Sequence, residues 1–263
     1  MENMMRKISL LVCSLLLLSL AACGGDKNEF PDLPEGAAGG GDATPAAATT
    51  ASILGKISFE GEVPKPVKLQ TTADPTCKKE LFTEDTKVKD GGLQNVIIYV
   101  SGGDGVAGKT FAPPSTPVEL DQVDCHYIPH ALVIQVGQEL AVKNGDMTLH
   151  NIHTLGEANP TWNVGQAAQN MVSKHTFDKP EVLLPVKCDV HGWMRAFIAV
   201  ISNPFGTVSA EDGKYELKLP AGKFEITAVH EKYGKQTTMV DVKDGDHSSV
   251  DFKFKASDAK SGN

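Results

Sequence analysis

The feature that most constrains this chain is the alternation of short β-prone runs with clusters of Gly, Pro, Asn and Asp from Ile53 onward. This pattern predicts an all-β protein, because strands end at short intervals and no long segment has apolar residues at helical spacing. We expect short helical turns only at Asp74–Thr83 and Pro160–Gln169. The expected strands include Ile53–Phe59, Asn95–Val100, Ala131–Val136, Glu139–Lys143, Val182–Val186 and Phe197–Ile201.

Polar and apolar residues alternate strictly in Lys214–Leu219 and again in Ser249–Phe254. Such alternation puts one face of a strand on a core and the other face in water. Glu211–Lys214 and Pro220–Lys223 have the composition of tight turns between strands. These strictly alternating runs lie after Asn203. We therefore expect a second, smaller β-sandwich after that residue.

The first residues have the layout of an export signal. Arg6 and Lys7 precede a short apolar run, which is too short to span a bilayer, and Leu20–Cys23 places small residues before a cysteine. Leu20–Cys23 resembles the lipobox of bacterial lipoproteins. The resemblance implies that residues 1–22 are removed, that Cys23 carries lipid, and that the protein is anchored at the bacterial cell envelope. The alternative is an ordinary signal peptide with a chance cysteine.

The composition and net charge limit the classes of partner that this chain can bind. Residues 23–52 are rich in Gly, Ala, Thr and Pro and predict a flexible tether. The net charge is −8, and Arg195 is the only arginine after residue 22. An acidic, nearly arginine-free chain lacks the basic footprint that nucleic acid requires. The acidity suits a basic protein partner, or reflects solubility alone.

The most informative segment is Lys187–Met194, which holds a thiolate, an imidazole and a thioether in one short loop, as Cys188, His191 and Met194. These are soft or borderline donors, which suit copper and disfavour calcium or magnesium. His150 offers a second imidazole at the end of an expected strand. Two histidines and a cysteine with a weak axial methionine form the blue-copper arrangement. A zinc or structural site, and a fold that has lost its metal, are the alternatives.

The region of about residues 124–201 resembles the cupredoxins, the family of plastocyanin and amicyanin. The resemblance rests on Tyr127–Pro129, Gln135–Gln138, Asn144–Asp146 with His150 and Asn151, and the spacing of Cys188, His191 and Met194. It implies a Greek-key β-sandwich that binds one copper ion in a type 1 site. The implied ligands are His150, Cys188, His191 and Met194, with Asn151 tying the two ligand segments together. Residues 53–123 have no place in a minimal cupredoxin, so we expect 53–202 to be a copper domain with an N-terminal extension.

The cysteines can be assigned in groups. Cys23 is the expected lipid site, and Cys77, Cys125 and Cys188 remain in the part expected to fold. Disulfides persist in exported proteins, and three cysteines can form only one intramolecular disulfide, so the unpaired cysteine is a candidate for another role. Our hypothesis is that Cys77 pairs with Cys125 and that Cys188 stays free as a ligand. A Cys125–Cys188 disulfide is the pairing that would exclude the copper site.

Two further histidines lie near the expected site. His153 follows His150 by three residues, so on a continuing strand it points to the opposite face, and we expect a surface or supporting role. For His130 we favour a core position over a ligand role. No Ser-His-Asp or paired-carboxylate arrangement stands out, although sequence alone would hide a dispersed one.

Residues 206–254 resemble the carboxypeptidase regulatory-like, or transthyretin-like, β-sandwich module, through Thr207–Leu217 and Leu219–Phe224. We expect this module over 203–256 and a disordered tail over 257–263. Ile53–Gly61 is similar to the first strand of the same module. The copper domain is therefore, by hypothesis, inserted after that strand, and pairing of Ile57 with the C-terminal sheet would support the insertion.

Together these features predict an envelope-anchored type 1 copper protein that passes electrons between redox partners, one of them a protein such as a c-type cytochrome. We expect a membrane attachment through lipid, no nucleic acid and no enzymatic activity. The alternatives are a lipoprotein that stores or delivers copper, and an interaction module that uses the copper fold only as a scaffold.

Overall fold

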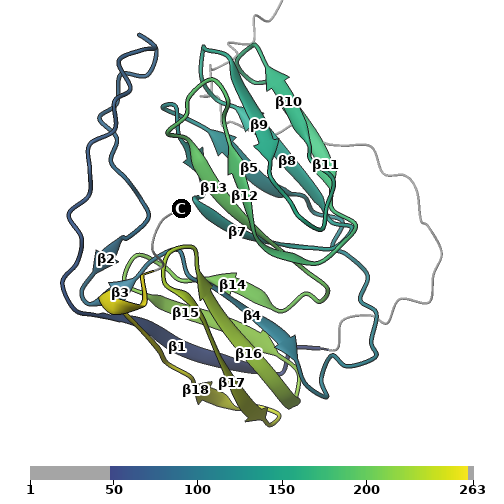
Figure 1. The fold of residues 1–263 in the computed structure, drawn as a ribbon. Helices are drawn as coiled ribbons and strands as arrows, with labels where there is room; N and C mark the ends of the chain where they lie inside the picture. The colour runs from purple at the N-terminus through teal and green to yellow at the C-terminus, as the bar shows by residue number, and fades with distance from the viewer. Residues whose placement is uncertain (1–47, 260–263) are drawn as a thin grey trace, which may run out of the picture. The chain divides into compact units, whose positions relative to one another are not determined.

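The computed structural model describes residues 48–259. The expected signal peptide, Cys23 and most of the expected tether lie outside the described residues. Within 48–259 the chain forms β-strands and one short 3-10 helix, Ala256–Asp258 (Figure 1), which confirms the all-β prediction. That helix occupies the start of the segment expected to be a disordered tail. No helix in the described part is long and apolar enough to cross a membrane.

Two sheets form the first sandwich, which holds the residues of interest. Its five-stranded sheet has the order β10-β9-β12-β13-β7, with bounds Asn163–Gln166, His150–Thr154, Glu181–Lys187, Arg195–Ile201 and Ala131–Gln135. Its four-stranded sheet has the order β11-β8-β5-β6, with bounds Val172–Thr176, Glu139–Asn144, Val118–Gln122 and Tyr127–Ile128. The chain crosses repeatedly between these sheets, and apolar side chains of both fill one core. Pro160–Gln169 contains β10, so the expected helical turn there is wrong, and Asp74–Thr83 forms turns without a helix.

Two other sheets form the second sandwich. Its six-stranded sheet has the order β15-β1-β3-β2, with β18 and β19 also paired to β1; the bounds are Lys214–Leu219, Ala51–Glu60, Gly92–Leu93, Val88–Lys89, His247–Ser249 and Phe252–Lys255. Its four-stranded sheet has the order β14-β4-β16-β17, with bounds Gly206–Val208, Ile97–Gly102, Gly222–His230 and Gly234–Val242. A second apolar core lies between these two sheets.

The sheets do not follow the expected boundary at residue 203. β1 pairs antiparallel with β15 and parallel with β19, and β4 pairs with β16. Ile57 of β1 is opposite Phe252, the pairing that the insertion hypothesis requires. Ile53 and Ile57 are fully buried in the second core, because their face of β1 needs the apolar face that the C-terminal strands provide.

The expected alternation holds in β15, where buried and exposed residues alternate without a break. The alternation also holds in Ser249–Phe254, where Phe252 and Phe254 are buried and the polar residues are exposed, although the run divides between β18 and β19. Gly213 lies in the turn before β15, where its φ is 78° and its carbonyl accepts from the N–H of Ile57 at 2.8 Å. A Cβ on Gly213 would lie 2.3 Å from the Ile57 carbonyl oxygen, so only glycine allows this approach to β1.

A small third cluster joins the two sandwiches. Ile97 of β4 and Val229 of β16 pack with Ala131 of β7 and with Ala199 and Ile201 of β13. All of these side chains are buried. The short residues on β7 and β13 allow the strands of the two sandwiches to approach closely.

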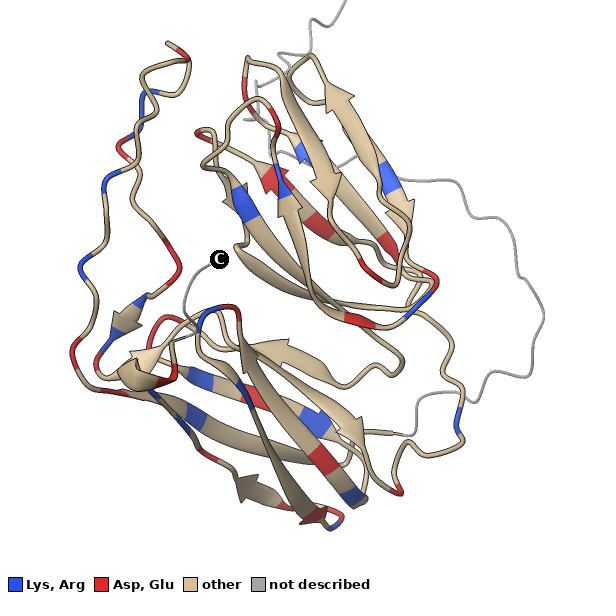
Figure 2. Ribbon diagram, viewed as in Figure 1, with Lys and Arg blue, Asp and Glu red and all other residues tan. Residues whose placement is uncertain are grey.

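Residues 61–87 form a long excursion between β1 and β2, which we call the arm (Figure 1). The Cys77–Cys125 disulfide ties the arm to the first sandwich, as expected, and Cys188 is the free cysteine of the described residues. The arm carries both basic and acidic residues (Figure 2), and pairs such as Lys68 with Glu80 neutralise each other locally. The arm is one part of the segment 53–123 that the cupredoxin resemblance left unplaced; the rest supplies β1 to β4 of the second sandwich and β5 of the first.

His230, at the end of β16, predicts an acid-sensitive step in the stability of the second sandwich. The residue is fully buried, and burial lowers the pKa of its imidazole to about 3, against about 6.5 in an unfolded chain. The unfolded chain therefore binds a proton below pH 6.5 that the folded protein does not, so stability falls as the pH drops. From pH 7 to pH 5 we expect a loss of about 2 kcal/mol from this group.

Denaturant unfolding of metal-free protein at the two pH values measures this loss. The His230→Gln variant should lose about 2 kcal/mol less than the wild type over the same interval. Equal losses in the two proteins would contradict the assignment.

Candidate metal centre

The four predicted ligands lie at one end of the first sandwich. His150 is the first residue of β9, and the other three lie in the loop that joins β12 to β13. Hydrogen bonds within this loop fold it tightly: Met194 N donates to the His191 carbonyl at 2.9 Å, and His191 N donates to Cys188 Sγ at 3.4 Å. These contacts turn the side chains of Cys188 and His191 toward the interior.

Three donor atoms converge at this end of the sandwich. The Nδ1 atoms of His150 and His191 lie 2.9 Å apart, and Cys188 Sγ lies 3.8 Å from His191 Nδ1. All three donors lie within 4.8 Å of one another, and all three residues are buried. Two nitrogens that share an ion at about 2.0 Å are themselves separated by about 3 Å. The donor set and its spacing therefore fit a copper-sized, soft or borderline ion.

Each histidine is oriented by a carboxylate on its outer nitrogen. His150 Nε2 lies 2.8 Å from Asp146 Oδ2, and His191 Nε2 lies 3.0 Å from Asp74 Oδ2. An imidazole that donates through Nε2 presents the lone pair of Nδ1, so both rings present the correct atom to an ion. Neither aspartate was predicted to contact a ligand. Asp74 belongs to the arm, far from the ligand motif in sequence, and no local signal indicates it.

The electrostatics of the site favour a thiolate. Burial raises the pKa of the Cys188 thiol. Hydrogen bonds from His150 and from backbone N–H groups lower it by more than burial raises it, so the pKa lies below its ordinary value. Burial opposes the charge on His150, while Asp146 and Cys188 raise its pKa well above the usual range. A metal ion binds the thiolate and the neutral imidazoles, so metal binding at this site releases protons.

Asn151 joins the two ligand segments. Its Oδ1 accepts from the backbone N–H of Asp189 at 2.6 Å, and its Nδ2 donates to the Asp189 carboxylate at 3.1 Å. Asp189 directly follows Cys188 in the ligand loop. Asn151 therefore holds the start of β9 against the loop at the point where the thiolate enters the site.

Met194 is completely buried and packs in the same core cluster as Cys188. His153 lies outside the donor group, partly exposed, with its Nδ1 2.9 Å from Asp189 Oδ2. His130 is also remote from the donors and contacts Glu84 and Glu231. The structure thus brings together His150, Cys188 and His191, places Met194 beside them in the core, and excludes His153 and His130.

The arm covers the second histidine. Only 2% of His191 is exposed, because Asp74 contacts its outer nitrogen and the Trp193 ring lies 5.1 Å from the imidazole centre. Trp193 Nε1 in turn donates to the Cys125 carbonyl, next to the disulfide. Water access to the donors is therefore restricted by the arm and the indole together.

Asp74→Ala should weaken copper binding by about 10- to 100-fold, the usual cost of removing the partner of a ligating histidine. Thr148 Oγ1 donates to Asp74 at 2.6 Å and lowers the pKa of its carboxyl, so the wild-type partner is anionic near neutral pH. Competition with a copper chelator measures the change. Asp244→Ala, which removes an exposed carboxylate hydrogen-bonded to Thr50, is the matched control and should leave the affinity unaltered.

Comparisons with known proteins give similarity in structure alone. No family model and no curated protein matches the sequence. Amicyanin from Paracoccus versutus aligns over 39% of this chain and 96% of its own, at 18% identity and a TM-score of 0.30. A purple cupredoxin from Nitrosopumilus maritimus aligns over 32% of this chain and 98% of its own, at 20% identity and a TM-score of 0.28.

A copper-containing nitrite reductase from Thermus scotoductus SA-01 aligns over 39% of this chain, at 21% identity and a TM-score of 0.31. The alignment spans 26% of the reductase chain. The case for a metal therefore rests on the donor atoms described above.

Proposed function

We propose that this chain is a type 1 copper protein of the cupredoxin kind that carries single electrons. The observation that carries the proposal is the convergence of two Nδ1 atoms and the buried Sγ of Cys188, each oriented by its neighbours. His150, Cys188 and His191 would hold one copper ion, and Met194 would supply a further, weak sulfur donor. Copper in such a site supplies a one-electron redox couple.

Hydrogen bonds within the chain hold the candidate ligands in fixed positions, as electron transfer requires. His150 is fixed at the start of a strand, and Asn151 fastens the thiolate loop to it. Asp146 and Asp74 hold the two rings. A site whose ligands are held before the ion arrives changes little when the ion changes charge, which lowers the cost of moving an electron.

Reconstitution with cupric ion tests the proposal. We expect one copper per chain and an intense visible absorption from the thiolate, bleached by ascorbate and restored when an oxidised c-type cytochrome accepts the electron. Binding of colourless cuprous ion, readily lost to a chelator, would assign the protein to copper storage or delivery. Absence of stoichiometric copper would overturn the proposal and leave an interaction module.

The envelope location is a second part of the proposal. It is supported by the lipobox-like Leu20–Cys23 in the sequence. A lipid on Cys23 would hold the protein at the membrane surface, where a redox partner can reach it. Expression of wild type and Cys23→Ala in a bacterial host tests this: the wild type should fractionate with membranes and the variant should be released. Equal release of both proteins would contradict lipid anchoring.

A further inference from the structure

A cavity lies where the arm meets both sandwiches, apart from the candidate copper donors. Its volume is about 360 Å³. The lining includes Phe82, Glu84 and Asp85 of the arm, Trp193 and Arg195 of the first sandwich, and Glu231 after β16. Cavities that bind small molecules in proteins have volumes of about 300–1,000 Å³. This cavity therefore has room for a small organic molecule.

Two aromatic side chains from different segments line the cavity, Phe82 from the arm and Trp193 from the loop between β12 and β13. Trp193 Nε1 donates to the Cys125 carbonyl at 3.0 Å, so the indole is held in place. Phe82 is 43% exposed, so apolar surface remains for a ligand to cover. A flat ring packs well against aromatic side chains, and these walls favour a ligand with an aromatic body.

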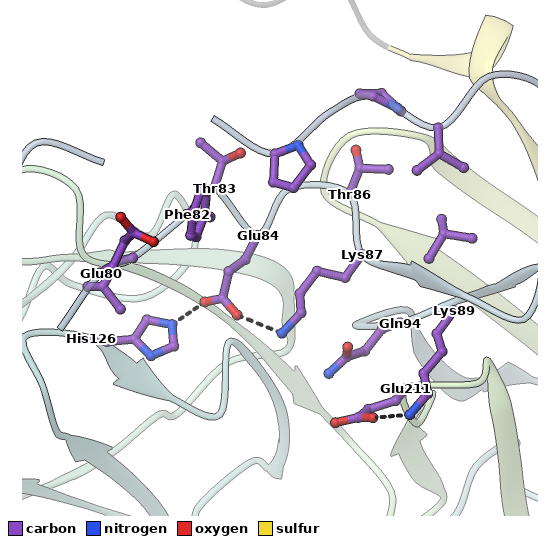
Figure 3. A pocket seen from close by; sticks show the side chains of 15 residues that line it. Glu80, Phe82, Thr83, Glu84, Thr86, Lys87, Lys89, Gln94, His126 and Glu211 are labelled. Atoms are coloured by element: carbon purple, nitrogen blue, oxygen red, sulfur yellow. Dashed lines mark hydrogen bonds and ion pairs between the residues drawn. The ribbon is translucent and has the colours of Figure 1, made fainter. Parts of the chain in front are cut away.

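The acidic side chains that line the cavity are already paired. Each of the three meets a basic group of the protein: Glu84 contacts His126 and Lys87, Glu231 contacts His130, and Asp85 accepts from Lys232. Figure 3 shows the Glu84 carboxylate between His126 and Lys87. Burial opposes a charge on His130, but Glu231 and Glu84 raise its pKa above the ordinary value. The negative charge of these carboxylates is therefore balanced within the protein.

Arg195 is the lining residue whose charge has no partner. It begins β13, and its side chain shares a face of that strand with Phe197, whose ring lies 5.6 Å from the ring of His130 in the cavity wall. Within residues 48–259 the guanidinium of Arg195 makes no hydrogen bond or ion pair. A guanidinium keeps its charge at every physiological pH and binds a carboxylate through two parallel N–H groups. The cavity thus presents one unpaired positive charge.

We propose that this cavity binds a small organic anion, an aromatic carboxylate, whose carboxylate pairs with Arg195 while its ring packs against Trp193 and Phe82. A cation would meet the uncompensated guanidinium, and an inorganic anion would leave the aromatic walls uncovered. A neutral ring would cover those walls but leave Arg195 without a partner beside it. The residues of this site are separate from the candidate copper ligands, so the metal-free protein binds the anion as well.

The test adds benzoate to the metal-free, full mature protein and follows individual side chains by NMR. We expect the signals of the Arg195 guanidinium and of the Trp193 indole N–H to shift together and to saturate with one dissociation constant. The indole signal of Trp162, which does not line the cavity, should stay still. Acetate has the charge without the ring, and benzamide has the ring without the charge. Each should bind at least about tenfold more weakly than benzoate, since each makes only half of the contacts.

Arg195→Gln should weaken benzoate binding by about 10- to 100-fold, because a charge-assisted pair is lost, and Arg195→Lys should lose less because the charge remains. Arg195 is exposed, so neither substitution disturbs a core. Lys174→Gln is the matched control, since it removes a positive charge paired with Glu139 outside the cavity, and it should leave the affinity unaltered. Three results would overturn the proposal: no saturable shift with benzoate, equal affinity for benzoate and benzamide, or equal affinity of the wild type and Arg195→Gln.

Discussion

Cys188→Ser should abolish the intense visible absorption of the copper-loaded protein and weaken copper binding by at least ~100-fold, a larger effect than the loss of a supporting partner. The absorption of a type 1 site arises from charge transfer between the thiolate and cupric ion, and a serine hydroxyl cannot replace it. A hydroxyl is also a harder donor that stays protonated near neutral pH, so the site loses both softness and charge.

The variant should nevertheless fold. Serine is slightly smaller than cysteine, and Cys188, which is 1% exposed, forms no disulfide. Absorption spectra and chelator competition measure the two losses, and circular dichroism checks the fold. Met147→Leu, which alters an exposed sulfur outside the donor group, should keep the wild-type spectrum. A Cys188→Ser protein that retains the band would exclude Cys188 as the ligand.

Removing the cross-link should have the second large effect. The Cys77→Ala/Cys125→Ala protein should lose about 4 kcal/mol of stability, because a bridge over a sequence separation of 48 residues restricts the unfolded chain by about that much. Guanidinium unfolding of metal-free protein, followed by tryptophan fluorescence, gives the difference.

Cys188→Ser is the natural control for that measurement, since it also removes a buried sulfur but no bridge. Its loss of stability should be several-fold smaller. The double variant should in addition bind copper more weakly, because Asp74 lies three residues before Cys77 and depends on the bridge for its position on His191. If the double variant unfolded at the same guanidinium concentration as the wild type, the disulfide would contribute little to the stability of the protein.

The strands were predictable because their signal is local. In Lys214–Leu219 the side chains of successive residues point to opposite faces, so the pattern of burial follows directly from the order of the residues. The convergence of Cys188 and His191 was predictable for a similar reason, since the two residues lie three apart in one short loop and can meet without help from distant segments. The prediction of a helical turn failed in Pro160–Gln169. The apolar residues of this segment show no regular spacing, and Asn163–Gln166 becomes a strand only through its pairing with β9.

No local pattern in the sequence indicates that Asp74 contacts His191, or that Glu84 contacts His126 and His130. Asp74 is one acidic residue among many in the sequence, and it contacts His191 only because the arm folds back over the ligand loop. Glu231 likewise meets His130 only because the two sandwiches pack against each other.

The amino-acid sequence by itself determined the all-β class and the residue types of the candidate donors, and it led to the hypothesis that Cys188 stays unpaired, since each depends on residue identity and short spacing. The tertiary structure alone decided which carboxylates orient the histidines, how deeply His191 is covered, and that β1 completes the C-terminal sheet. The physical reason is that these contacts join residues far apart in the chain, and such residues meet only after burial of the two apolar cores has positioned their strands.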